Sequence, residues 1–378
     1  MKKPLFLFLF IYLGTAFFAA QKKADLSKNK ANSLIYEQPD EAIAIASKLL
    51  TTEKKVDDMA DLYMIISNAY IAKKNNDSSF FYNLKAKNLI AKTNLTSTKL
   101  KILNSIAVQY QQMELYEEAL KILDEAQVTT DKLSDKIPLF FYNTAFINNT
   151  RGIIYRNQAN SNLALQKLKM AVENFKKLPL DKKNAANLSI AYHNMASCYL
   201  DLSQLQQALT YFAEAKNYAQ KYDDAILIAY NLKGEGEVFF LTNQHSEALK
   251  ALYLAEKRAE PFSDLVLNSE IYNLLANTNL AINNIQQFQY YNQKYAQILK
   301  ILENDELKSF NRYANAQDLD QKAIAEKIKK QFNLYNWLTI ILTIFLVGFL
   351  IKKILNLRKN NYRRKRIIEN LTIIEKVE

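Results

Sequence analysis

Few side chains in this sequence could do chemistry, and their spacing gives no catalytic site. The 378 residues include one cysteine, Cys198, and two histidines, of which His193 is nearer to Cys198 in the sequence. On one helix, positions five apart lie about 140° apart around the axis, so these two side chains cannot share a metal ion without a third element. The sequence Gly234-Glu235-Gly236 lacks the third glycine of a dinucleotide-binding loop. We therefore expect no enzyme activity, no metal and no cofactor.

The composition favours long helices joined by short links. Only 5 of the 378 residues are glycine and 5 are proline, while 49% are hydrophobic. An all-β protein needs turn residues at short intervals, and a phosphate-binding loop needs clustered glycines, so neither class fits. We therefore predict an all-α protein.

A register of small and aromatic residues repeats through the chain and predicts packed helical hairpins. A small residue is followed three positions later by an aromatic one in the pairs Ser67–Tyr70, Ala107–Tyr110, Gly152–Tyr155, Ala196–Tyr199 and Gly236–Phe239. Nine positions after each aromatic stands another small residue, at Ser79, Ala119, Ala164, Ala208 and Ala248. Two antiparallel helices that cross closely require small side chains at the crossing, and one hairpin cannot bury its apolar face alone. Successive hairpins are therefore expected to stack.

This register resembles the tetratricopeptide repeat, and the match covers roughly residues 25–298. The resemblance implies a solenoid of helical hairpins, which we place at residues 21–298. The small residues fall at 67, 107, 152, 196, 236 and 276, so the steps are 40, 45, 44, 40 and 40. The family's usual period is about 34 residues. Longer helices or longer links must absorb the difference.

The resemblance also implies a concave groove lined by positions 5 and 9 of each first helix. In this register the candidate partner-binding residues are Asn68, Asn104, Asn149, His193, Ser197, Lys233, Glu237, Asn273 and Asn277. Asparagine is a poor residue inside a helix because its amide competes for backbone hydrogen bonds, so its recurrence needs a reason. Side-chain amides can pair with both the N–H and the C=O groups of an extended peptide. The open alternative is that these asparagines only reflect an asparagine-rich composition.

Both ends of the chain carry membrane signals. Residues 1–20 begin with two lysines, continue with an apolar run and end in small residues, which is the layout of a secretory signal peptide or an uncleaved signal anchor. Residues 332–351 are 20 positions without a charge, long enough for a single-pass transmembrane helix. Residues 299–331 contain no glycine or proline and predict a juxtamembrane helix, through which the chain could form a homodimer.

The formal net charge of +12 is concentrated at the two ends. Residues 352–378 hold nine Lys or Arg against three Glu, whereas the repeats are nearly neutral. A nearly neutral array offers no basic face, so we expect no contact with nucleic acid. The positive-inside rule places the basic tail, 352–378, in the cytoplasm and the repeats on the other side of the inner membrane of a bacterium.

These features favour a non-catalytic, membrane-anchored scaffold or sensor input that binds a peptide or protein partner on the extracytoplasmic side. The order of signal, repeats, membrane helix and basic tail also resembles the input half of bacterial envelope regulators, which continue into a helix-turn-helix or histidine kinase output. The alternative function is therefore a truncated member of such a signalling family, whose output domain is missing or lies on another chain.

Overall fold

A computed structural model describes residues 25–35, 38–73, 75–262 and 264–374, and this part of the chain is helical with no strand. Residues 25–33 form a first helix. The remaining elements are α2 (Pro39–Leu50), α3 (Val56–Ala72), α4 (Asn76–Lys87), η1 (Ile90–Lys92), α5 (Thr96–Gln112), α6 (Tyr116–Thr130), α7 (Pro138–Asn157), α8 (Ser161–Phe175), α9 (Lys182–Asp201), α10 (Leu205–Gln220), α11 (Ala225–Leu241), α12 (His245–Ala259), α13 (Leu265–Ala281) and α14 (Ile285–Ile374). The predicted secretory signal, residues 1–20, lies outside the described residues.

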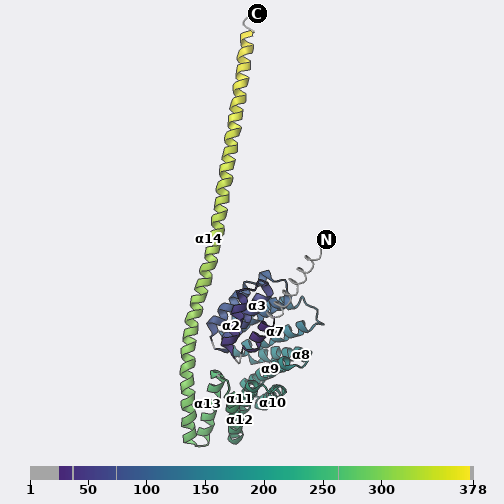
Figure 1. The fold of residues 1–378 in the computed structure, drawn as a ribbon, viewed down its shortest axis with the longest axis vertical. Helices are drawn as coiled ribbons and strands as arrows, with labels where there is room; N and C mark the ends of the chain where they lie inside the picture. The colour runs from purple at the N-terminus through teal and green to yellow at the C-terminus, as the bar shows by residue number, and fades with distance from the viewer. Residues whose placement is uncertain (1–24, 36–37, 74, 263, 375–378) are drawn as a thin grey trace, which may run out of the picture. The chain divides into compact units, whose positions relative to one another are not determined.

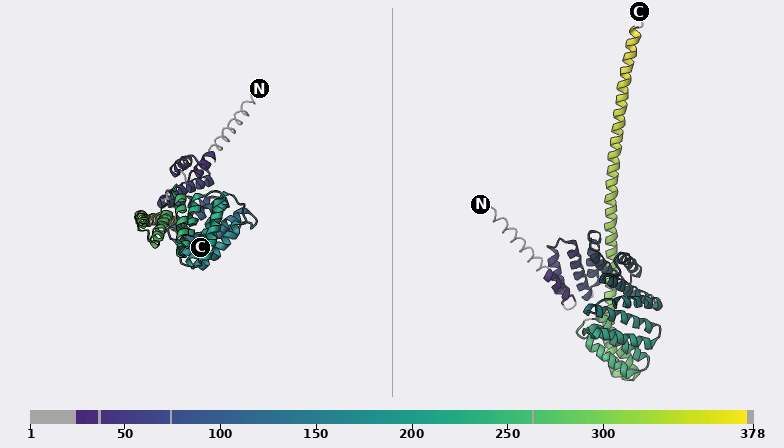
Figure 2. Two further views of the ribbon diagram at one scale, coloured as in Figure 1. Left: turned by 90° about the horizontal axis from the view of Figure 1, so that it is seen from below. Right: turned by 90° about the vertical axis from the view of Figure 1, so that its right-hand side faces the viewer.

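The helices from α3 to α13 form a stack of hairpins in two layers (Figures 1 and 2). Each first helix packs against the second helix of its own hairpin, as α7 does against α8 and α9 against α10. The first helices also contact one another in sequence, from α3 through α5, α7, α9 and α11 to α13. The first helices therefore form one continuous layer, and the predicted all-α solenoid is confirmed.

Glycines mark the closest contacts between helices. A Cβ atom added to Gly152 would lie 2.6 Å from Cγ of Leu168, and one added to Gly236 would lie 2.7 Å from Cγ of Leu252. These two positions are the small residues of their repeats, so the predicted tight crossings are confirmed. Gly234 has a packing role that the sequence did not reveal, because its added Cβ would lie only 2.4 Å from the ring of Phe212.

The turns of the five hairpins from α5–α6 to α13–α14 are made without glycine. One residue per turn adopts a left-handed backbone with φ between 58° and 61°, at Glu114, Ala159, Ser203, Asn243 and Asn283. The next N–H group then donates back to the carbonyl of the repeat's aromatic position, as Asn160 does to Tyr155 at 2.8 Å. This is the Schellman arrangement, in which glycine is the usual residue. Because non-glycine residues occupy these turns, the chain can form many helical hairpins with only a few glycines.

The long steps of the repeat are absorbed by longer helices and longer links. The first helices α7 and α9 each have 20 residues, whereas α5 and α11 have 17. Pro138 starts α7, where its missing N–H costs no hydrogen bond. The steps of 45 and 44 residues that end at positions 152 and 196 are the steps that contain these two longer helices.

The helix α14 runs through the boundary between two compact units, 1–309 and 310–378. In the first unit, the beginning of α14 acts as the second helix of the last hairpin, since Tyr291 is buried with residues of α12 and α13 and Phe288 packs beside it. In the second unit, the segment Ile328–Lys365 is long and apolar enough to cross a membrane, and it contains the predicted span 332–351. No other helix of that kind occurs among the described residues.

Candidate ligand-binding groove

The layer of first helices, which we call the inner layer, encloses a groove of about 930 Å³ in the N-terminal half of the array. Its lining comes from residues 25–33, from α3, α5 and α7, from the link before α9 and from the first two turns of α9. We call this cavity the N-terminal groove. A volume of this size is within the range of pockets that hold small molecules or short peptide segments.

Asparagine amides and apolar side chains together line the N-terminal groove. The amides belong to Asn29, Asn32, Asn68, Asn104, Asn143, Asn184 and Asn187. Apolar contributions include Met64, Ile65, Val108, Leu139 and Phe146. The lining therefore combines apolar surface with groups that both donate and accept hydrogen bonds.

Three buried amide atoms at this groove have no hydrogen-bond partner. They are the acceptors Asn104 Oδ1 and Asn184 Oδ1 and the donor Asn187 Nδ2. The first two residues are only 6% and 5% exposed. An unpaired buried polar group costs about 1–3 kcal/mol, and native proteins hold few of them. Two acceptors and one donor match the N–H and C=O groups of a peptide backbone.

In two of these amides, those of Asn104 and Asn184, the other atom is fixed by the fold. Asn104 Nδ2 donates to Asn143 Oδ1 at 2.8 Å, and Asn143 Nδ2 donates to the carbonyl of Leu139 at 2.7 Å. Asn184 Nδ2 donates to the carbonyl of Phe175 at 3.0 Å, across the link between α8 and α9. The partner atoms set the side-chain orientation, so the unpaired oxygens are held in place before any ligand arrives.

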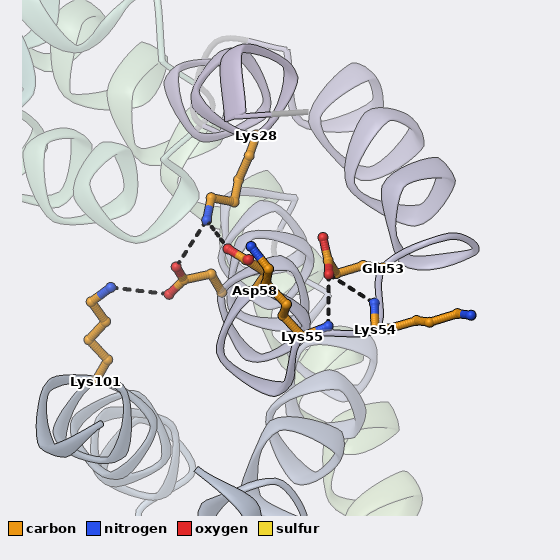
Figure 3. Close-up of polar contacts among 7 residues, drawn as sticks. Lys28, Glu53, Lys54, Lys55, Asp58 and Lys101 are labelled. Atoms are coloured by element: carbon orange, nitrogen blue, oxygen red, sulfur yellow. Dashed lines mark hydrogen bonds and ion pairs between the residues drawn. The ribbon is translucent and has the colours of Figure 1, made fainter. Parts of the chain in front are cut away.

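The charges at one end of the groove are paired with each other. Lys28 reaches from residues 25–33 to Asp58 and Asp61 of α3, and Lys101 of α5 approaches Asp61 at 3.1 Å (Figure 3). Burial alone would lower the pKa of Lys28, but the hydrogen bond to Asp58 and the nearby carboxylates outweigh it and raise that pKa above its ordinary value. At the other end, the ammonium group of Lys183 lies 4.3 Å from the ring of Tyr142. The charges of Lys28, Asp61 and Lys101 are thus paired, whereas Lys183 keeps its positive charge beside the ring.

Only two of the nine predicted partner-binding residues line this groove. Asn68 and Asn104 do, whereas the lining does not include Asn149, His193, Ser197, Lys233, Glu237, Asn273 or Asn277. Asn149 accepts a long hydrogen bond, 3.5 Å, from Asn194, and Ser197 is buried. These seven residues stay predictions as ligand contacts.

In the C-terminal half of the inner layer, the predicted residues pair mainly with protein groups. Lys233 forms ion pairs with Glu270 at 2.8 Å and Glu237 at 3.7 Å. Asn277 Nδ2 donates to Asn273 Oδ1 at 3.1 Å. We call these residues, together with His193 and its partner Asn231, the C-terminal polar row. Their polar groups tie α9, α11 and α13 to one another.

His193 and Cys198 are not poised for acid–base or nucleophilic chemistry. The ring of His193 lies 3.0 Å from Asn231 Oδ1 and packs edge-on against Phe212 and Tyr230. Burial, and secondarily the charge of Lys233, lowers the pKa of His193 to about 3, so the imidazole is neutral. Burial raises the pKa of Cys198 to about 12, which keeps the thiol protonated. Within the described ranges, no group of three His, Cys, Asp or Glu side chains is placed to hold a metal ion.

The register missed groove residues that lie near the starts of the long helices and before the first position that the register selected. Asn143 of α7 and Asn184 and Asn187 of α9 lie six to nine positions before the positions that the register selected. Of these, Asn184 lies in the stretch by which α9 begins earlier than α5 or α11 relative to the small residue of its repeat, so the excess length of that step is the signal that could have found it. No such signal pointed to Asn143 and Asn187. Nothing in the register pointed to Asn29 and Asn32.

Comparisons with known proteins agree with this architecture. A tetratricopeptide repeat family model matches residues 187–260. The chain is similar to response regulator aspartate phosphatase E of Bacillus subtilis (strain 168), at 27% identity over 207 residues, which are 54% of this chain and 52% of that protein. The chain therefore spans about half the length of the curated relative that it matches.

Two solved structures share the fold. The apo form of RapI gives a TM-score of 0.55 at 17% identity and covers 75% of this chain and 99% of that chain. The structure of NprR in complex with its cognate peptide NprX gives a TM-score of 0.57 at 13% identity and covers 82% of this chain and 89% of that chain. At these identities the likeness shows the fold alone. The repeat register, the stacked hairpins and the match of the repeat model to residues 187–260 together support tetratricopeptide-type repeats in this chain.

Proposed function

We propose that this protein binds an extended peptide, or an extended segment of a protein, in the N-terminal groove. The observation that carries the proposal is the set of three buried, unpaired amide atoms on Asn104, Asn184 and Asn187. A peptide backbone supplies both N–H and C=O groups, so it can satisfy all three atoms and remove their desolvation penalty. The apolar lining accommodates side chains of such a ligand.

The size of the groove supports a short ligand. Its lining comes from five successive segments: residues 25–33, α3, α5, α7 and α9. Neighbouring helices lie roughly 9 Å apart, so the path across them is roughly 35 Å, which about ten extended residues cover. The paired charges at the groove favour a ligand segment with few charged side chains. The peptide that is bound in the NprR–NprX structure is a precedent for peptide binding on this fold.

The proposal includes a membrane tether. The segment Ile328–Lys365 supplies the span, and the lysines and arginines after residue 351 supply a stop-transfer signal. The repeats would then lie on the extracytoplasmic side and bind their ligand there, as a scaffold or as the input of a sensor. No catalytic role is proposed.

Selection from a random peptide library tests the binding function. A library of displayed ten-residue peptides is panned on the full chain in detergent, and the affinity of the best isolate is measured by fluorescence anisotropy. We expect micromolar binding that falls at least tenfold in Asn187→Ala, because this substitution removes the unpaired donor and breaks no hydrogen bond that the fold uses. Failure to select any peptide, or equal binding by Asn187→Ala, would contradict the proposed site.

Reporter fusions test the tether separately. Alkaline phosphatase and green fluorescent protein are fused in turn after residues 300 and 378. We expect phosphatase activity only at 300 and fluorescence only at 378. Fluorescence at position 300 would overturn the proposed topology and leave the binding test standing.

A further inference from the structure

Residues 25–33 lie at the N-terminal start of the predicted repeat array, before the first position that the register selected, and they supply part of the groove. One face of this helix is buried, and a neighbouring face lines the groove. Ala31, together with Ile35 just after the helix, is buried against residues of α2 and α3, including Ala46, Leu62 and Ile66. The neighbouring face carries Lys28, Asn29 and Asn32, which all line the N-terminal groove.

Two lysines on this helix form ion pairs with different helices. Lys28 is half-buried, pairs with Asp58 and lies 3.5 Å from Asp61, a carboxylate that Lys101 of α5 also holds. Lys30 is exposed and pairs with Glu41 of α2 at 2.7 Å, and it does not line the groove. Lys28 thus connects the helix to α3 and, through the shared carboxylate of Asp61, to Lys101 of α5, whereas Lys30 connects it to α2.

We propose that residues 25–33 are a ligand-binding element of this protein, in which Asn29 and Asn32 contact the peptide and Lys28 positions them by its shared ion pairs with Asp58 and Asp61. The inference rests on the proposed function of the groove and extends it to a segment that precedes every candidate partner-binding residue of the register. Lys28 is a positioning residue, and the two asparagines are contact residues.

The physical reason is the small apolar area that holds this helix. Ala31 and Ile35 are its buried hydrophobic residues, whereas α5 and α9 bury many more side chains. A segment anchored by little apolar surface opens at a low free energy, and a binding site that needs the closed form loses affinity in proportion to the open fraction. The half-buried ion pairs of Lys28 therefore have a direct effect on the fraction of chains with a complete groove.

The two lysines provide a matched pair of variants. Hydrogen–deuterium exchange is measured over residues 25–33 in the full chain without peptide, for the parent protein, Lys28→Met and Lys30→Met. We expect at least fivefold faster exchange in Lys28→Met and little change in Lys30→Met, with Lys28→Arg returning the parent rate. Exchange over α9 should not change, which shows that the array is still folded. Equal exchange in the two methionine variants would overturn the positioning role of Lys28.

Peptide affinity provides the second readout, with the library-selected decapeptide as the probe. We expect Lys28→Met and the double variant Asn29→Ala/Asn32→Ala each to weaken binding about fivefold to tenfold, and Lys30→Met to leave it unchanged. Parent-like affinity in the double variant would remove these asparagines from the site. If the parent chain binds no selected peptide, both the proposed function and the contact role of Asn29 and Asn32 are contradicted. The exchange experiment does not depend on a peptide, so it still tests whether Lys28 stabilises residues 25–33.

Discussion

The same repeat positions have different surroundings in the two halves of the inner layer. In the N-terminal half, Asn68 and Asn104 line an open groove, and Asn104 keeps one amide oxygen unpaired. In the C-terminal half, Lys233 is paired with Glu270, and Asn273 with Asn277. A repeat position therefore does not determine function by itself, because what it faces depends on the lengths of the neighbouring helices.

The difference arises from the extended first helices α7 and α9. Both helices begin earlier than α5 does relative to the small residue of the repeat, and their first two turns place Asn143, Asn184 and Asn187 in the groove with residues of α3 and α5. The shorter helices α11 and α13 have no such extension, and their polar side chains pair with protein groups: Lys233 of α11 with Glu270 of α13, and Asn277 with Asn273 on α13 itself. We infer that the N-terminal half binds and that the C-terminal half holds the array together.

The largest expected effect is on the packing of the C-terminal half. Gly234→Ala places a methyl group against the ring of Phe212, at a distance no real Cβ contact has. Overpacking of this kind costs about 1–3 kcal/mol, and we expect the upper part of that range because the obstacle is a fully buried ring. Chemical denaturation followed by circular dichroism measures the loss.

A second glycine provides the control for this substitution. Gly348 has no atom within 4 Å of an added Cβ, so Gly348→Ala should leave the unfolding midpoint unchanged. The folded fraction of Gly234→Ala should still bind the selected peptide with parent affinity. A loss of affinity in that fraction would show that the two halves are not separate in function.

A smaller effect is expected from acid on the C-terminal polar row. The pKa of His193 is about 3 in the folded chain, against about 6.5 when unfolded, so below pH 6.5 the unfolded state binds a proton that the folded state does not. Stability is therefore full above pH 6.5 and falls by about 1–2 kcal/mol by pH 5. The groups that face the ring are Lys233 and Arg156, which are cationic throughout this range, and neutral Asn231.

Denaturation at a series of pH values checks this dependence. His193→Gln should flatten the profile between pH 7 and pH 5, because glutamine does not titrate. Peptide affinity should vary little over the same range, since no histidine lines the N-terminal groove. An unchanged slope in His193→Gln would show that another group causes the acid sensitivity.

The smallest effect concerns the turns, which both halves share. Ala159 and Asn243 occupy the left-handed position in the hairpins α7–α8 and α11–α12. Glycine adopts this conformation without strain, and asparagine tolerates it better than alanine does. Ala159→Gly should therefore raise the free energy of unfolding by about 0.5–1 kcal/mol, and Asn243→Gly by less. Thermal unfolding of both variants measures the difference, and destabilisation by Ala159→Gly would contradict the assigned turn geometry.

The fold could be predicted from the sequence because its determinants are local and repeated. Gly152 and Gly236 mark helix crossings, and their spacing from Tyr155 and Phe239 fixes which side of each helix is buried. The role of Gly234 could not be predicted, since it depends on where the ring of Phe212 from the preceding hairpin arrives in space.

The site was only partly predictable for a related reason. Asn68 and Asn104 follow from the register, but the register treats every repeat alike and so also selected Lys233, which is occupied by an ion pair. Asn29 and Asn32 precede the first small–aromatic pair of the register, Ser67–Tyr70, and only the folded chain brings them to the groove. Which amides lack a partner is a property of the packed structure.

The most direct test of this account compares two asparagines at the same repeat position. Asn68 lines the N-terminal groove, whereas Asn277 is exposed beside Asn273 in the C-terminal polar row. Affinity for the selected decapeptide is measured by fluorescence anisotropy for Asn68→Ala and for Asn277→Ala. We expect at least a fivefold loss of affinity in Asn68→Ala and parent affinity in Asn277→Ala. Equal losses, or a loss confined to Asn277→Ala, would contradict the assignment of binding to the N-terminal half.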